Sequence, residues 1–140
     1  MKCYEDATIS YKRALLYLDY SFGDTDEEEN LLDIERLKCH INLAAVFLER
    51  EMYDEVISNC RLGLKIDPDC VKGLYRMGIA YLKRGDLQEA QDHLYAALKR
   101  GSAEGRDTLH AIEKAIRDLN VKWREYRAKA GDIARAAFKT

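Results

Sequence analysis

A repeat of 34 residues organises the centre of this chain. Sequence 38–64 and sequence 72–98 are two copies of one pattern, in which small, aromatic and aliphatic residues fall at matching offsets. The matched pairs include Leu43 and Met77, Ala44 and Gly78, Phe47 and Tyr81, Val56 and Ala90, and Leu64 and Leu98. This period is typical of a repeat made of two antiparallel helices. The small residues Ala44 and Gly78 let the paired backbones approach closely, and the aromatic residues fill the remaining space.

The pattern resembles the tetratricopeptide repeat, or TPR. Asp67-Pro68-Asp69 closes the first copy where that family usually has its proline, whereas Ser102 holds this place in the second copy. The resemblance implies an all-α fold, a TPR solenoid of antiparallel helix pairs with a long C-terminal capping helix, in a single domain over residues 1–140. We expect the second helix of a truncated first repeat at 1–20, a second repeat with an extended first helix at 25–68, a third repeat at 69–102 and a C-terminal helix at 103–140.

The same pattern predicts where the helices and the core lie. Helices are expected near 2–20, 25–50, 53–66, 70–84, 87–100 and 105–137. The residues expected to be buried between paired helices are Ala44, Phe47, Tyr53, Gly78, Tyr81, Ala90 and Leu94. A single proline and eight glycines fit a chain that is mostly helical.

The first twenty residues resemble half of a repeat. Tyr4, Ala7 and Tyr11 match a set that begins at Tyr53, an offset of 49 residues rather than 34. The extra residues lie around 21–37, where a capping box of Thr25 with Glu28 predicts the start of a helix. A repeat half cannot bury its apolar face alone. We therefore expect a fragment of a longer protein, whose first helix either forms a homodimer or stays mobile.

Two segments carry concentrated charge. The acidic run 26–29 lies in the first turn of the extended helix, where the helix dipole favours anions. It predicts a solvated helix start, and a docking patch for a basic partner is the alternative. The last helix carries cations at Lys122, Arg124, Arg127, Lys129, Arg135 and Lys139, beside the aromatic residues Trp123 and Phe138. It predicts a capping helix with a solvated face, or else a site for calmodulin, another protein or an anionic surface.

Charge and motifs exclude several functions. The net charge of −2 is too small for a general field that attracts nucleic acid or an anionic membrane, and no apolar run approaches the ~20 residues of a membrane span. Four cysteines without Cys-x-x-Cys spacing indicate a reducing, intracellular compartment. His40, His93 and His110 have no partner at metal-ligand spacing, and phosphate-binding and nucleophile motifs are missing. We expect neither metal, cofactor nor catalysis in this fragment.

Polar residues converge at one position of the repeat. Asn42 and Arg76 are equivalent, Lys72 lies one helical turn before Arg76, and Lys38 holds the position of Lys72 in the earlier repeat. The first helices of stacked repeats line one concave surface with axes ~8–10 Å apart, which places Asn42, Lys72 and Arg76 across one groove. Two cations and an amide suit a peptide that ends in carboxylates. The alternative is that these charges are ordinary solvated side chains.

Sequence 38–45 and sequence 71–78 around these residues resemble the carboxylate-clamp class of TPR domain. That class binds the C-terminal Glu-Glu-Val-Asp tail of cytosolic heat-shock chaperones, of which the 90-kDa class is favoured here. The resemblance therefore implies a cytoplasmic location, with the nucleus as a second one. Three of the family's clamp residues map onto Asn42, Lys72 and Arg76, and Lys38 is a further candidate for the peptide groove. The remaining clamp residues belong to the missing first helix.

The lengthened link after the first helix is similar to the TPR region of FKBP-type immunophilins. The segment Tyr11-Lys-Arg-Ala-Leu, the acidic insert that follows and a long final helix at 108–138 carry this resemblance. In that family the repeats follow peptidyl-prolyl cis-trans isomerase domains. The resemblance implies a co-chaperone whose catalytic domain lies outside this chain. The alternative is a TPR scaffold that holds another protein through its convex face or C-terminal helix and leaves the groove unused.

Overall fold

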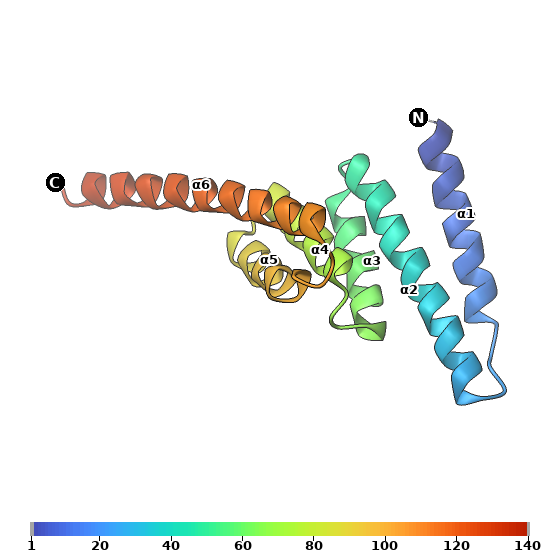
Figure 1. Ribbon diagram of the computed structural model, residues 1–140. Helices are drawn as coiled ribbons and strands as arrows, with labels where there is room; N and C mark the ends of the chain where they lie inside the picture. The colour runs from blue at the N-terminus through green and yellow to red at the C-terminus, as the bar shows by residue number, and fades with distance from the viewer. Residues whose placement is uncertain (1, 140) are drawn as a thin grey trace.

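The protein folds as a row of helices (Figure 1), and the computed structural model describes residues 2–139. The helices are α1 (Lys2–Asp19), α2 (Asp26–Glu49), α3 (Tyr53–Ile66), α4 (Val71–Arg84), α5 (Leu87–Gly101) and α6 (Arg106–Ala137). No strand forms within residues 2–139, so the predicted all-α fold is confirmed. The predicted helix bounds agree with the observed ones to within one or two residues.

The helices pack mainly against their neighbours in sequence. The most extensive contacts join α2 to α3 and α4 to α5, and α3 packs on α4 to connect the two pairs. Helix α1 packs on α2 alone, through a stripe that includes Tyr11, Leu15 and Leu18. Its opposite side leaves Ile9 and Leu16 more than half exposed, so one apolar face of α1 has no partner within the described chain.

A glycine sets the distance between α4 and α5. A Cβ atom at Gly78 would lie 2.7 Å from both Cγ and Cδ2 of Leu94, which is itself fully buried. Such a contact is impossible without displacing the branched part of that leucine, so the small residue at this position is required for close packing. The role that the sequence predicts for Gly78 is therefore confirmed.

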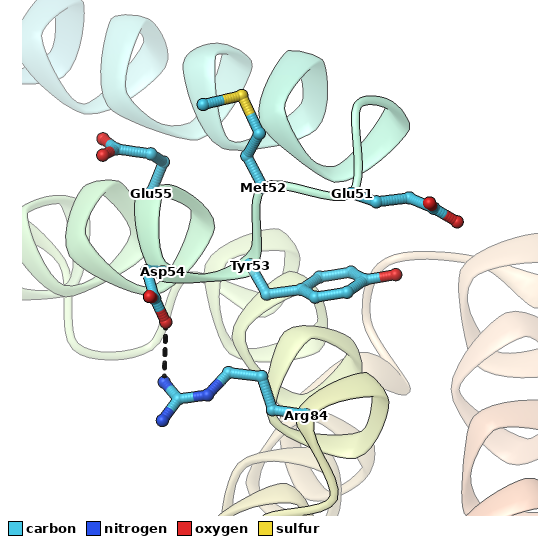
Figure 2. A pocket seen from close by; sticks show the side chains of 6 residues that line it. All are labelled: Glu51, Met52, Tyr53, Asp54, Glu55 and Arg84. Atoms are coloured by element: carbon cyan, nitrogen blue, oxygen red, sulfur yellow. Dashed lines mark ion pairs between the residues drawn. The ribbon is translucent and has the colours of Figure 1, made fainter.

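One core prediction was wrong. The other six residues expected between paired helices are buried, but Tyr53 is only half-buried. Tyr53 is the first residue of α3, directly after the turn that joins α2 to α3, and its ring extends along an open hollow beside Arg84 (Figure 2). The repeat position is the one expected, but the end of a helix pair leaves one side of the ring to solvent.

Both central repeats turn from first to second helix in the same way. The N–H of Met52 donates to the carbonyl oxygen of Phe47 at 2.9 Å, and the N–H of Asp86 donates to that of Tyr81 at 2.9 Å. In each turn the preceding residue has left-handed backbone, Gly85 with φ 85° and Glu51 with φ 57°. This is the Schellman arrangement, in which glycine is the favoured residue because a side chain adds strain.

We expect Glu51→Gly to stabilise the protein by about 1 kcal/mol, because it removes the cost of a left-handed non-glycine residue. The change is measured as the free energy of unfolding in urea. Glu51→Ala is the matched control, since it removes the same charge but keeps a Cβ atom, and it should give little or no gain. Equal stabilisation by both substitutions would show that charge, rather than backbone strain, limits this turn.

Arg36 fastens the end of α1 to α2. Its Nη2 donates to the carbonyl oxygens of Leu18 at 2.8 Å and Ser21 at 3.0 Å, at the C-terminal end of α1. Its Nη1 pairs with Glu29 at 2.9 Å and Asp33 at 2.7 Å on α2. The guanidinium therefore adds a second donor to the Leu18 carbonyl, which also accepts the N–H of Ser21 at 3.1 Å, and places a cation where the α1 dipole is negative.

The turn before α2 is held by hydrogen bonds beside the Arg36 guanidinium. Thr25 is the N-cap of α2 and accepts the N–H of Glu28 at 3.2 Å, as the sequence predicts. The carboxylate of Glu28 accepts the N–H of Asp24, and that of Glu29 accepts the N–H of Gly23, each at 2.8 Å. The acidic run is thus partly a capping device for this turn.

We expect Arg36→Met to loosen α1, because the substitution keeps an apolar stem but removes the guanidinium's hydrogen bonds to Leu18 and Ser21 and its ion pairs with α2. A hydrogen bond from a charged group is worth ~1.5–3 kcal/mol, so amide exchange over residues 11–18 should accelerate by about tenfold or more. Arg50→Met, at an exposed position one residue past α2, is the control. Unchanged exchange in the Arg36 variant would mean that apolar packing alone holds α1.

The same turn should respond to acid. The Gly23 N–H and the Arg36 guanidinium hold the pKa of Glu29 below its ordinary value of 4.5. A carboxyl group with a lowered folded pKa stabilises the fold above its unfolded pKa, and this contribution is lost as pH falls through the folded value. Chemical shifts of residues 18–23 should therefore change only below about pH 4.5, and Glu29→Gln should remove this titration. A transition nearer neutrality, or one unaffected by Glu29→Gln, would contradict this assignment.

Helix α6 begins as a cap and ends in solvent. Ile112, Ala115 and Leu119 are buried against the preceding helices, which covers the end of the last helix pair as predicted. Beyond Trp123 every residue up to Lys139 is exposed except Gly131, which is half-buried, and the helix continues through Gly131 without a break. None of the described helices combines the length and the apolar character needed to cross a membrane.

Candidate functional site

Helices α2 and α4 bring the predicted groove residues to one place. Ile41 precedes Asn42 on α2 and is buried. A Cβ atom at Gly63 would lie 2.9 Å from the Cδ1 atom of Ile41, and a Cβ atom at Gly73 would lie 3.0 Å from it. The two glycines, one on α3 and one on α4, thus form a socket for Ile41. The packing of Ile41 in this socket fixes how far α2 is shifted along its axis relative to α4, and therefore where Asn42 lies beside α4.

Arg76 spans the two helices at this level. Its Nη1 donates to the carbonyl oxygen of Ile41 at 2.8 Å, so the half-buried guanidinium lies beside the backbone that carries Asn42. A guanidinium has five N–H donors, and most of them remain for a ligand. Lys72 projects from the same face of α4 one turn earlier, and it is exposed, as Asn42 is.

Lys72 and Arg76 form no ion pair with any residue in the described range 2–139. Both cations are therefore available to a carboxylate from another molecule. Lys38 is in a different state, because its Nζ pairs with Glu35 at 2.9 Å on the same exposed face of α2. Lys72 and Arg76 therefore differ from Lys38, because only Lys38 already has an acidic partner.

A hollow opens between the cations and α6. It has a volume of about 300 Å³ and is lined by Lys72, Tyr75, Arg76, Asp107, Thr108 and Ala111. Sequence reasoning missed the three residues from α6, because their position depends on how α6 packs, and it missed Tyr75 because an aromatic residue at this spacing reads as core. Burial raises the pKa of Tyr75, so its hydroxyl stays protonated and can donate.

The groove continues along α4. Helices α4 and α6 make few contacts, and two further hollows of about 450 and about 350 Å³ lie between them. Both are lined in part by Ile79, Lys83 and Asp118. Cations and carboxylates are mixed here, so net positive charge is confined to the end near Lys72 and Arg76.

The hollow drawn in Figure 2 is a less suitable site for an acidic ligand. It has a volume of about 460 Å³ at the turn between α2 and α3, and its lining includes three carboxylates, from Glu51, Asp54 and Glu55. Its single cation, Arg84, is already paired with Asp54 at 3.1 Å and with Asp86 at 3.2 Å. A carboxylate ligand would be repelled there.

Other reactive groups have structural partners. His40 contacts the side-chain oxygen of Asn59 at 3.2 Å, and His93 contacts the carbonyl oxygen of Glu89 at 2.7 Å. Burial raises the pKa of the Cys60 thiol to about 12, which keeps it a neutral core residue. Within the described residues no cluster of three or more His, Cys, Asp or Glu side chains is arranged to hold a metal ion.

Comparison with solved structures identifies the architecture. The C-terminal TPR-containing domain of a putative FK506-binding protein from Plasmodium falciparum superposes with a TM-score of 0.68, at 26% identity over 88% of this chain and 82% of that one. The chain is a TPR solenoid. The yeast Hsp90 co-chaperone Cns1 gives a TM-score of 0.64 at 23% identity, covering 97% of this chain and 44% of that one, and so supports the fold alone.

Sequence comparison connects this TPR solenoid with peptidyl-prolyl cis-trans isomerases. Bovine FKBP4 is 33% identical over 88 residues, which are 63% of this chain and 19% of that protein. The Saccharomyces cerevisiae isomerase CYP7 is 32% identical over 127 residues, or 85% of this chain and 31% of that protein. The chain thus spans less than a third of the length of these relatives. No family model matches the sequence.

Proposed function

We propose that this TPR domain is the chaperone-binding module of a co-chaperone, and that its groove takes an acidic C-terminal peptide. The observation that carries the proposal is a pair of cations without an ion pair, Lys72 and Arg76, of which Arg76 donates a hydrogen bond to the carbonyl oxygen of Ile41, the residue before Asn42. The class of partner is suggested by what proteins of the same fold bind: yeast Cns1 is an Hsp90 co-chaperone, and the TPR2B domain of yeast Sti1 has been solved in a complex with pHsp70.

The chemistry of the groove suggests how each residue acts. Arg76 binds acidic side chains of the peptide, and Lys72 binds carboxylate oxygens as a mobile point charge. Asn42 holds the terminal carboxylate or the adjacent backbone, because its amide both donates and accepts. A tail that ends in Glu-Glu-Val-Asp, as in the 90-kDa class of chaperone, offers acidic side chains and a terminal carboxylate for these three residues. Such a partner implies a cytoplasmic or nuclear location.

The parent protein is, in this proposal, an FKBP-type isomerase whose catalytic domain lies outside residues 1–140. This rests on the match to bovine FKBP4, a peptidyl-prolyl cis-trans isomerase of which this chain covers 19%. The TPR domain would then bring the isomerase to clients held by the chaperone.

We expect Arg76→Ala to weaken binding of a Glu-Glu-Val-Asp peptide by roughly 10- to 150-fold, because it removes a charge-assisted hydrogen bond worth ~1.5–3 kcal/mol. Isothermal titration calorimetry measures the effect. Lys38→Ala is the matched control and should have a smaller effect, since Lys38 is already paired with Glu35. Binding should also weaken as salt rises, because the groove is open to solvent.

Amidation of the peptide's C-terminus should lower affinity strongly, because it removes the charge that the groove is proposed to hold. If amidation and Arg76→Ala both left the affinity unchanged, the carboxylate-clamp proposal would be wrong. A scaffold that binds through its convex face or C-terminal helix would then take its place.

A further inference from the structure

Exposed aromatic residues gather at both ends of the molecule, and the two ends carry opposite charge. One end is the tip of the α1–α2 hairpin, residues 17–34, and the other is the distal part of α6, residues 121–139. In Figure 1 the hairpin tip lies at the lower right, and α6 extends to the left, away from the rest of the row. The hairpin tip lines none of the groove hollows, and the distal part of α6 reaches only the one farthest from Lys72, through Val121, Lys122 and Glu125.

The hairpin tip is apolar and strongly acidic. Its large side chains are open to solvent: Tyr17 is 71% exposed, Tyr20 79%, Phe22 82% and Leu31 64%. Residues 17–34 contain seven Asp and Glu residues and neither Lys nor Arg. Arg36 neutralises part of this charge through Glu29 and Asp33. The other carboxylates of the tip form no ion pair within the described chain.

The distal part of α6 is apolar and basic. Residues 121–139 contain six Lys and Arg residues against two acidic ones, in a chain whose net charge is −2. Tyr126 is 60% exposed, Ile133 64% and Phe138 90%. Two of the cations pair with the two acids along the helix, Arg127 lies over the Trp123 ring at 5.8 Å, and the other cations form no ion pair within the described residues. Trp123 packs against the core, and beyond it every residue of this part is exposed except half-buried Gly131.

We propose that the distal part of α6 of one molecule docks on the hairpin tip of a second copy of this chain. The two surfaces complement each other in charge, and each offers aromatic residues whose burial would add to the attraction. The contact cannot form within one molecule, because α6 points away from the tip (Figure 1). Since the two patches differ, the contact is head-to-tail and adds copies without closing into a dimer.

The size of the two patches limits the affinity of the head-to-tail contact. The exposed part of α6 is about 22 Å long at ~1.5 Å per residue, so the contact belongs to the small, transient class below about 1,200 Å². We expect dissociation constants between about 10 µM and 1 mM, and marked weakening by salt, because the charges are exposed. An isologous dimer through the open face of α1 would instead stop at two copies.

Sedimentation equilibrium tests the proposal on the full chain between about 10 µM and 1 mM. The weight-average mass should rise steadily with concentration in ~20 mM salt, and in ~300 mM salt the association should be about tenfold weaker or more. A mass that stays at that of the monomer throughout would overturn the proposal and leave the two ends to other partners. A mass that levels off at the dimer would overturn it in favour of the α1 interface.

Two variants make the test specific. The tip variant carries Tyr20→Ser, Asp26→Asn and Glu27→Gln, and the tail variant carries Arg124→Gln, Lys129→Gln and Phe138→Ser. Each should be monomeric alone, yet an equimolar mixture should form a 1:1 dimer and nothing larger, because each molecule keeps one native end. Circular dichroism checks that both remain folded.

A control variant with Glu49→Gln, Glu113→Gln and Tyr95→Ser removes two charges and one aromatic residue elsewhere on the exposed surface. It should associate as the unmodified chain does. If the mixture of tip and tail variants stayed monomeric, or if the control lost association equally, the head-to-tail contact would be excluded.

Discussion

The packing of Ile41 into the space left by Gly63 and Gly73 is the contact on which the rest of this structure depends. Three helices meet there, and a Cβ atom on either glycine would meet the Cδ1 atom of Ile41 at 3.0 Å or less. The carbonyl oxygen of the same Ile41 receives the hydrogen bond from Arg76. The core therefore positions the Arg76 guanidinium, so the proposed peptide groove would need little rearrangement to bind. Such preorganisation reduces the ordering cost of binding a flexible peptide.

Charge is distributed unevenly over this small domain. The groove contributes two free cations at one level, the hairpin tip is acidic, and the end of α6 is basic. The overall charge of −2 conceals this pattern, so net charge gives little guide to the partners of the domain. Asp107 adds a further constraint, because it faces the same hollow as Lys72 and Arg76. Its carboxylate reduces the net positive charge of that hollow.

Much of the fold could be predicted from the sequence because the same packing contacts occur in both repeats and so leave the same residue pattern twice. Ala44 and Gly78 share one position, and both prove to be buried where paired helices approach. Contacts that occur once leave no such signal. The bonds from Arg36 to the end of α1 and the approach of α6 to Lys72 depend on three-dimensional packing that no periodicity records. Tyr53 was misjudged for a related reason, since its repeat position is regular but its place at the end of a helix pair is not.

The central claim is that the concave side of α2 and α4 binds an acidic C-terminal peptide. Nuclear magnetic resonance tests it most directly, by following backbone amide shifts while a Glu-Glu-Val-Asp peptide is added. Our account predicts that the largest changes occur at and around Asn42, Lys72 and Arg76, extending to the first turn of α6. Changes confined to the convex helices α3 and α5, or to the distal part of α6, would contradict it.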